Sequence, residues 1–331
     1  MLRSPPAGST AAVAVAFAIS FGPPAFAGPA LTSPADAAVE LTAAGAALHV
    51  DVDRHAFHDS EAVLAWVRRS ADIVTRYYGR FPVGALTLRI AAVHGEGVHG
   101  GETFANPAAL IRVRLGREAT AAQLLNDWVL VHEMTHLALP DTGESHSWLS
   151  EGVATYVEGV ARVQAGNRSE ADVWAEEIRS MPRGLPAAGD RGLDHTHSWG
   201  RTYWGGAMFC LLADVEIRRR TQLRLGLQDA LRALLDASGG LATDWPIARA
   251  LRTADAAVGT TTLEDLYAQM KDAPVAPDLV KLWQELGVTG DATGAVLSDS
   301  APLAPVRRAI MRPRQVRTSR SSPRSLQTPC T

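Results

Sequence analysis

Two histidines four residues apart could perform chemistry together. The segment His132-Glu133-Met134-Thr135-His136 lies in a stretch whose apolar spacing predicts a helix. Residues i and i+4 of a helix share a face, so both imidazoles can bind one metal ion. Glu133 follows the first histidine and can activate a metal-bound water as a general base. The competing interpretation is an amphipathic helix with two hydrogen-bonded histidines, but this pattern is rare by chance in a chain of 331 residues.

A catalytic zinc site needs a third protein ligand and one open position. Residues 148–152 read Trp-Leu-Ser-Glu-Gly, and their carboxylate belongs to Glu151. Pro140 ends the predicted histidine helix, so a second helix can return and present Glu151 to the ion. The other side chains that compete for this role are Asp141, Glu144, His146 and Glu158. The first three lie in a polar loop, and Glu158 lies about 10 Å beyond Glu151 on the same helix face.

The hydrophobic pattern predicts an α+β fold, with a small mixed α/β N-terminal half and an all-helical C-terminal half. In the first half we expect strands in 39–52, 86–93 and 108–115, a helix over 61–78 and a Gly-rich loop over 94–101. A helix over 120–139 should carry both histidines. Leu124 and Trp128 precede them at the same spacing of four residues, so they should lie on the same helix face and form an apolar wall next to the metal site. Further helices are expected over 148–164, 170–180, 201–219, 225–237, 244–253, 262–271 and 277–286.

The two ends of the chain differ in composition from the rest. Residues 1–27 combine Arg3, an apolar stretch and an Ala-Phe-Ala sequence that ends at Ala27. This pattern predicts a secretory signal peptide that is cut after Ala27, and hence a secreted or periplasmic protein. No run is long enough to predict a membrane span. The expected organisation is a signal peptide (1–27), a linker (28–37), a catalytic domain (38–290) and a disordered Arg-rich tail (291–331).

Charge and cysteine content argue against two classes of protein. The tail from Arg307 holds seven arginines and the leader holds Arg3, which leaves 24 basic residues against 35 acidic ones, a net charge of about −11 for the body. A negative body argues against a nucleic acid partner. Two cysteines make no disulfide framework. Cys210 lies in an apolar run and is expected in the core, whereas Cys330 lies in the tail.

The two motifs together resemble those of the gluzincin metallopeptidases. His-Glu-x-x-His followed by Trp-Leu-Ser-Glu-Gly is similar to the pattern of the glycyl aminopeptidases and aminopeptidase N, and the short connecting loop fits the peptidase-MA-like branch. The resemblance covers roughly residues 86–287. It implies a thermolysin-like zincin catalytic domain with Zn²⁺ held by His132, His136 and Glu151.

A later segment extends this resemblance. Residues 201–207 read Arg-Thr-Tyr-Trp-Gly-Gly-Ala. In these families a tyrosine followed by Gly-Ala opens a helix, and its hydroxyl stabilises the oxyanion, which gives that role to Tyr203. His195 and His197 are rivals for it, because thermolysin-like members use a histidine.

The resemblance implies hydrolysis of peptide bonds in a peptide or protein substrate, in an aminopeptidase-like manner. Aminopeptidases of these families bind the substrate amine with a glutamate on an edge strand. Gly-Gly-Glu-Thr-Phe at 100–104 places Glu102 one residue early, so Glu102 is either that anchor or a loop acid. A zinc endopeptidase, a secreted zinc-binding module without catalysis and a purely structural helical protein are the alternatives. The intact Glu133 favours an enzyme, while the substrate sequence and the oligomeric state stay open.

Overall fold

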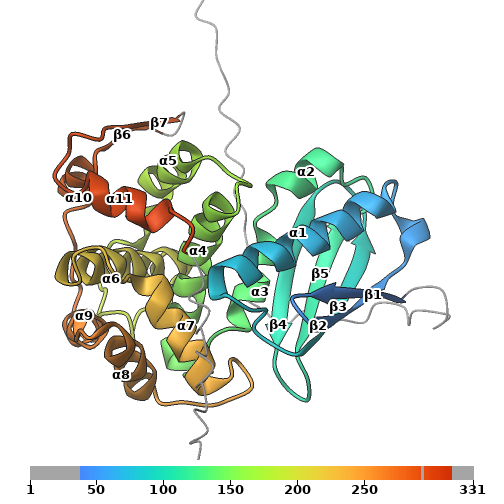
Figure 1. The fold of residues 1–331 in the computed structure, drawn as a ribbon, viewed down its shortest axis with the longest axis horizontal. Coiled ribbons are helices and arrows are strands. Elements are labelled where there is room, and N and C mark those ends of the chain that lie inside the picture. Colours follow the sequence, from blue (N-terminus) through green and yellow to red (C-terminus); the bar gives the residue numbers. More distant parts are fainter. Residues whose placement is uncertain (1–37, 292–293, 315–331) are drawn as a thin grey trace, which may run out of the picture. The chain divides into compact units, whose positions relative to one another are not determined.

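The structure is a computed structural model that describes residues 38–291 and 294–314 (Figure 1). The predicted signal peptide, the predicted linker and residues 315–331 of the predicted tail lie outside the described residues. Within the part that is described, no helix is both long enough and apolar enough to cross a membrane.

A five-stranded sheet forms the N-terminal half, and its strand order is β1-β2-β3-β5-β4. The strands are β1 (Ala38–Ala43), β2 (Ala46–Val52), β3 (Ala85–Val93), β4 (Val98–Phe104) and β5 (Leu110–Gly116). The central strands β2, β3 and β5 are parallel, whereas β1 and β4 are antiparallel edges. Helix α1 (Ser60–Tyr78) lies across the sheet in Figure 1. Alternate residues of β3 and β5 are buried, as the period of two predicts.

Strand β4 differs from the Gly-rich loop that was expected over 94–101. The loop covers only residues 94–97, and the chain then pairs with β5 through an irregularity between Val98 and Gly100. Gly100 has φ +134°, a conformation that side chains rarely adopt, so glycine permits this bulge. Because glycine is depleted in strands, the composition hides the edge strand.

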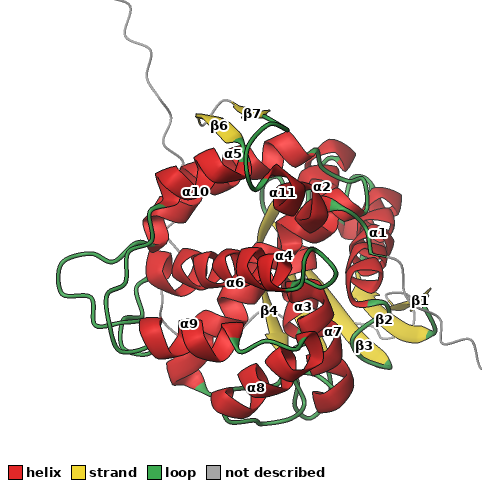
Figure 2. Cartoon of the chain, turned by 60° about the vertical axis from the view of Figure 1, so that its left-hand side comes forward, coloured by secondary structure: helices red, strands yellow, loops and turns green. Residues whose placement is uncertain are grey.

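Helices account for most of the remaining chain. Their bounds are α2 (Ala121–Asn126), α3 (Val129–His136), α4 (Ser147–Gln164), α5 (Glu170–Ser180), α6 (Gly206–Arg220), α7 (Leu227–Ser238), α8 (Ile247–Val258), α9 (Thr262–Met270), α10 (Leu279–Leu286) and α11 (Ala304–Met311). Helices α4 and α6 lie side by side (Figure 2). The second half is not all-helical, because it also holds the hairpin β6 (Val288–Asp291) and β7 (Gly294–Leu297).

The single helix expected over 120–139 is divided into α2 and α3 at Asp127, whose backbone is extended. The Asp127 carboxylate accepts hydrogen bonds from the backbone N–H groups of Val129 and Leu130, each at 3.2 Å. These bonds satisfy amides at the start of α3, as an N-cap does. Leu124 therefore lies on another helix, outside the histidine column.

The catalytic domain was expected to end at residue 290, but the folded part of the chain continues beyond that residue. Helix α11 buries Val306 and Ile310, and Arg307 is only 2% exposed. The Arg307 guanidinium pairs with Glu170 at 3.0 Å and with Asp299 at 2.6 Å. The expectation of disorder is therefore wrong for this part of the tail, because one of its arginines neutralises acids of the folded body.

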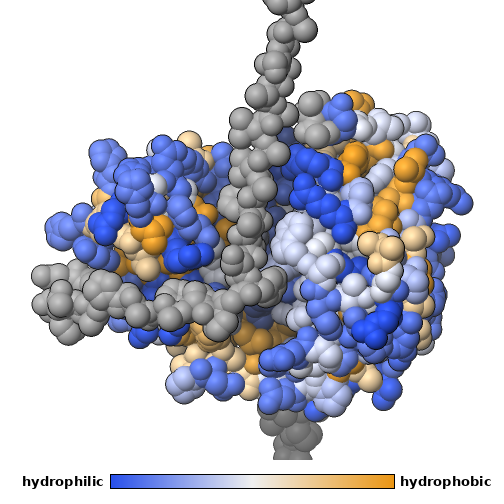
Figure 3. Space-filling model, turned by 180° about the vertical axis from the view of Figure 1, so that it is seen from behind, coloured by the Kyte–Doolittle hydropathy of each residue, from blue (hydrophilic) through white to orange (hydrophobic). Residues whose placement is uncertain are grey.

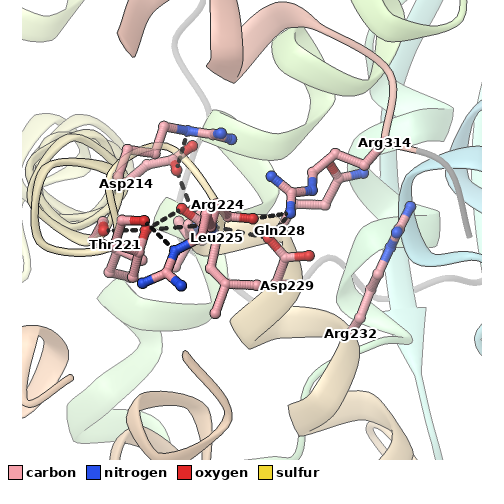
Figure 4. Close-up of polar contacts among 12 residues, drawn as sticks. Asp214, Thr221, Arg224, Leu225, Gln228, Asp229, Arg232 and Arg314 are labelled. Carbon is pink, nitrogen blue, oxygen red and sulfur yellow. Dashed lines mark hydrogen bonds and ion pairs between the residues drawn. The ribbon is translucent and has the colours of Figure 1, made fainter. Parts of the chain in front are cut away.

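Polar contacts also fasten the segment that follows α11 to the junction of α6 and α7 (Figure 4). Asp214 of α6 accepts a hydrogen bond from the N–H of Leu227, the first residue of α7, at 2.9 Å. Arg314 pairs with Asp229 at 3.0 Å and donates to the carbonyl of Arg224. The last described residue thus contributes to the packing of α7.

Large apolar side chains fill the interior, and the surface is mainly polar. Cys210 is buried, which confirms the prediction that it is a core residue. The face seen in Figure 3 is largely hydrophilic, with apolar residues in separate groups.

Candidate metal centre

The three side chains expected to bind a metal lie together. The Nε2 atom of His132 is 3.1 Å from Oε2 of Glu151, and the Nε2 atom of His136 is 3.5 Å from the same oxygen. One ligand atom from each residue can be chosen so that all three lie within 4.8 Å of one another. Two imidazole nitrogens and a carboxylate oxygen are a donor set that catalytic zinc sites use, so these residues fit Zn²⁺.

The charges of the centre favour a cation. Burial alone would raise the pKa of Glu151, but hydrogen bonds with His132 and His136 outweigh burial and hold that pKa well below its ordinary value. Burial alone would lower the pKa of His136, but its hydrogen bond with Glu151 outweighs this and raises that pKa. Glu151 is therefore ionised, and its partly buried negative charge favours a positive partner.

Neighbouring groups orient both histidine rings. The Ser150 hydroxyl lies 2.8 Å from Nδ1 of His136, so Nε2 of that ring is left to face the ligand cluster. The His132 ring lies between two aromatic rings. The Trp128 ring meets it edge-on at 5.5 Å, and the Tyr203 ring is nearly parallel to it at 6.0 Å. The expected apolar wall is therefore confirmed for Trp128.

Glu133 of α3 packs against β4, where two residues fix its position. The Thr103 hydroxyl lies 2.6 Å from Oε2 of Glu133 and 3.0 Å from its backbone carbonyl oxygen. A Cβ atom at Gly101 would lie only 2.6 Å from Cγ of Glu133. The strand thus holds one carboxylate oxygen and leaves space for the side chain. Sequence reasoning missed both residues, although an edge strand over 98–104 would have placed Gly101 and Thr103 on one face.

Glu102 lies between these two residues and points away from them. Successive Cβ positions of a strand point to opposite faces. The side chain of Thr103 and the Cβ position of Gly101 both face Glu133. Glu102 is instead in register with Arg112 of β5. The structure does not bring Glu102 to the metal ligands, so its role as a substrate anchor stays a prediction that this placement does not support.

Tyr203 reaches the centre from a short π-helix, Arg201–Gly205, which runs directly into α6. Such π-helical turns are often found at functional sites. The Tyr203 ring stacks on His132, as described above, and also on Trp199 at 5.8 Å. Burial, followed by the charge and hydrogen bond of Glu151, raises the pKa of Tyr203. The phenol is therefore protonated and can donate a hydrogen bond.

The rival residues are placed elsewhere. His195 is exposed and lies 2.8 Å from Asp272, and His197 is also exposed. Among the described residues, His132, His136 and Glu151 form the one group that meets the geometry of a metal site. The other candidates for the third ligand therefore lie outside it, namely Asp141, Glu144, His146 and Glu158. Glu158 is buried and pairs with Arg162 of its own helix at 3.4 Å.

Comparison with known proteins gives the fold. The sequence matches no family profile and no curated protein. The structure is similar to that of an aminopeptidase N family protein from Idiomarina loihiensis, with a TM-score of 0.58 and 16% identity over 76% of this chain and 49% of that chain. The two share a fold. An M1 zinc metallopeptidase from Deinococcus radiodurans also matches, with a TM-score of 0.47 and 14% identity over 73% of this chain and 52% of that chain.

The fold shared with the Idiomarina loihiensis protein agrees with the fold that the two sequence motifs led us to expect. The chain spans about half the length of each of these two structures.

Proposed function

We propose that this chain is a zinc metallopeptidase that hydrolyses peptide bonds. The observation that carries the proposal is the convergence of His132, His136 and Glu151, with Glu133 held beside them by Thr103. A metal site that served only structure would need no such carboxylate next to its ligands. The fold shared with an aminopeptidase N family protein supports the same conclusion.

The surrounding residues have distinct roles in this proposal. Zinc, when bound by the three ligands, supplies a Lewis acid that polarises a carbonyl and lowers the pKa of water. Glu133 accepts the proton of the attacking water and passes it to the leaving amine. The Thr103 hydroxyl holds Oε2 of Glu133, which leaves Oε1 for the proton. The Tyr203 phenol donates a hydrogen bond to the negative oxygen that develops in the transition state.

A peptide library with mass spectrometric detection of products tests this function. The zinc-loaded protein should produce fragments that disappear on chelation and return when zinc is added. Glu133→Gln should retain zinc and lose activity by orders of magnitude. Glu118→Gln, a matched control that changes an exposed glutamate, should retain both zinc and activity. Zinc binding without any fragments would indicate the non-catalytic zinc module. Full activity of Glu133→Gln would remove this residue from the mechanism.

We extend the proposal to the removal of N-terminal residues, because the structural neighbour is described as an aminopeptidase N family protein. This mode requires recognition of a free amine, and the structure does not place Glu102 to provide it. Parallel digestion of free and N-acetylated peptides decides the question. Selective cleavage of free peptides supports an aminopeptidase, and equal cleavage indicates an endopeptidase.

A further inference from the structure

The tryptophans of this chain divide sharply by exposure. Six of the eight are buried: Trp66, Trp148, Trp174, Trp204, Trp245 and Trp283. The other two, Trp128 and Trp199, are 46% and 39% exposed. An indole ring carries a large apolar surface, so leaving it in water forgoes the stabilisation that burial would provide. The two exceptions therefore point to a role other than filling the core.

Both exposed indoles belong to the surroundings of the metal centre. Trp128 directly precedes α3 and touches His132 edge-on at 5.5 Å. Trp199 begins the helical run that continues into the π-helix, and it stacks on Tyr203 at 5.8 Å, with 25° between the ring planes. Tyr203 in turn stacks on His132 at 6.0 Å. The two partly exposed rings are thus each at most two ring contacts away from a metal ligand.

A positively charged side chain beside Trp199 disfavours a positively charged ligand. The Arg183 guanidinium lies 5.9 Å from the centroid of the Trp199 ring. A lysine or arginine side chain that approached Trp199 would meet this cation, whereas an apolar side chain would not. Ligand sites commonly combine apolar and aromatic walls with a few polar groups. The exposed rings therefore suit an uncharged, large side chain.

We propose that Trp128 and Trp199 are walls of a subsite that binds a large aliphatic or aromatic side chain of the substrate next to the scissile bond. The position next to the scissile bond rests on the proposed function, since it requires that the bond is cleaved at this metal centre. The binding of the side chain rests on the two exposed rings alone. The preferred substrates are peptides with Phe, Leu, Trp or Met at that position rather than Ala, Lys or Arg.

Cleavage of the peptide library by the zinc-loaded protein is the first test. At one position beside the cleaved bond, Phe and Leu should be preferred over Ala by at least about tenfold, as for other apolar pockets. Trp128→Ser and Trp199→Ser should each reduce this ratio to roughly threefold or less. Val280→Ser removes an exposed apolar side chain far along the chain on α10 and should leave the ratio unchanged. A wild-type protein that cleaves without this preference, or tryptophan variants that keep it, would overturn the subsite and leave the proposed function intact.

Binding to the zinc-loaded Glu133→Gln protein is the second test, because it needs no turnover. Calorimetry should show that Ala-Ala-Phe-Ala-Ala binds at least about tenfold more tightly than penta-alanine. Adding Trp128→Ser or Trp199→Ser to this protein should remove the difference, while adding Val280→Ser should not. Equal affinity for the two peptides overturns the subsite even if the wild-type protein cleaves no library peptide, an outcome that would separately contradict the proposed function.

A second copy of the chain is the other possible occupant. Sedimentation of the wild-type protein and of the two tryptophan variants distinguishes it. The proposal expects the same oligomeric state in all three proteins. A dimer that dissociates in Trp128→Ser or Trp199→Ser would show that the rings form an interface between copies, and this would overturn the subsite.

Discussion

Gly152 and Gly206 touch through their backbones: a Cβ atom added at Gly152 would stand 2.3 Å from the Cα atom of Gly206. Gly152 follows the ligand Glu151 in α4, and Gly206 begins α6 directly after the π-helix of Tyr203. This close approach brings the two helices together where each presents a residue of the metal centre. Because Gly152 and Gly206 have no side chains, the two helices can approach closely enough to bring Glu151 and Tyr203 together.

Gly152→Ala should separate α4 from α6. Extra atoms in a packed core typically cost about 1–3 kcal/mol of folding free energy. Urea unfolding should show this loss, and turnover should fall as Tyr203 moves away from Glu151. Gly159→Ala is the control on the same helix, because its Cβ would meet only a side chain, that of Val173, at 3.1 Å. Equal effects of the two substitutions would contradict a special role for the backbone contact.

Glu151→Ala should greatly reduce zinc binding. The folded wild-type protein should hold about one zinc per chain, and a site with two ligands left is expected to lose most of its affinity. Metal analysis after dialysis measures this. Glu144→Ala, which removes an exposed acid that competed for the role on sequence alone, should keep the zinc. Full metal content in Glu151→Ala would show that the third ligand is another residue.

Thr103→Val should lower kcat without releasing zinc. The change removes a hydrogen bond to the Glu133 carboxylate, and bonds to charged groups contribute about 1.5–3 kcal/mol. If that energy positions the general base, kcat should fall by about 10- to 100-fold with little change in KM. Thr103→Ser retains the hydroxyl and should restore most of the activity. A loss of the same size in Thr103→Ser, which keeps the hydroxyl, would show that the hydrogen bond does not account for the effect.

Tyr203→Phe should reduce kcat by about 10²- to 10³-fold, the effect of removing one oxyanion donor. Zinc content should be unchanged, because the phenol is not one of the three ligands. His197→Ala should have little effect, since His197 is exposed. Steady-state kinetics of both variants compare them. A large loss in His197→Ala with almost none in Tyr203→Phe would reverse the two roles.

Stability should fall as the pH rises from about 4.5 to 8, through a buried acid on α5. Burial, followed by the charges of Glu176 and Glu158, raises the pKa of Glu177 from 4.5 to about 8. Between these values the folded protein binds a proton that the unfolded chain has lost, so the contribution is fully present below pH 4.5 and lost by pH 8. Glu177→Gln should flatten this part of the curve of unfolding free energy against pH.

Denaturant unfolding at several pH values measures that curve. Glu61→Gln, which changes an exposed acid on α1, should preserve the slope of the wild-type protein. A Glu177→Gln protein whose stability still declines between pH 5 and 8 as steeply as that of the wild type would show that another group is responsible.

Much of the metal centre could be predicted from the sequence because its information is local. The spacing of His132 and His136 places two ligands on one helical turn, and Glu151 follows after one helix break. The helices of the second half were predictable for a similar reason, since their apolar residues repeat with the helical period. The resemblance to known motifs added Tyr203, which no periodicity would have identified.

The remaining features depend on contacts that are distant in the sequence or that oppose local preference. Gly101 and Thr103 lie in a Gly-rich segment that becomes a strand only by pairing with β5. Asp127 interrupts an apolar helical pattern because its carboxylate caps the next helix. The residues around Arg307 have a composition that is typical of a disordered tail. The burial of Arg307 depends on its pairing with Glu170, which lies far away in the sequence.

The last residue of α4 gives the metal centre a dependence on the order of synthesis. The side-chain amide of Gln164 donates a hydrogen bond to the carbonyl of Ile310 in α11, at 2.9 Å. A growing chain contains all three zinc ligands once residue 151 has been made, but this hydrogen bond cannot form until α11 follows. Until then the side-chain amide of Gln164 can pair only with that of Gln228 in α7. The last of these contacts of the helix that carries Glu151 therefore forms only after residue 310 has been made.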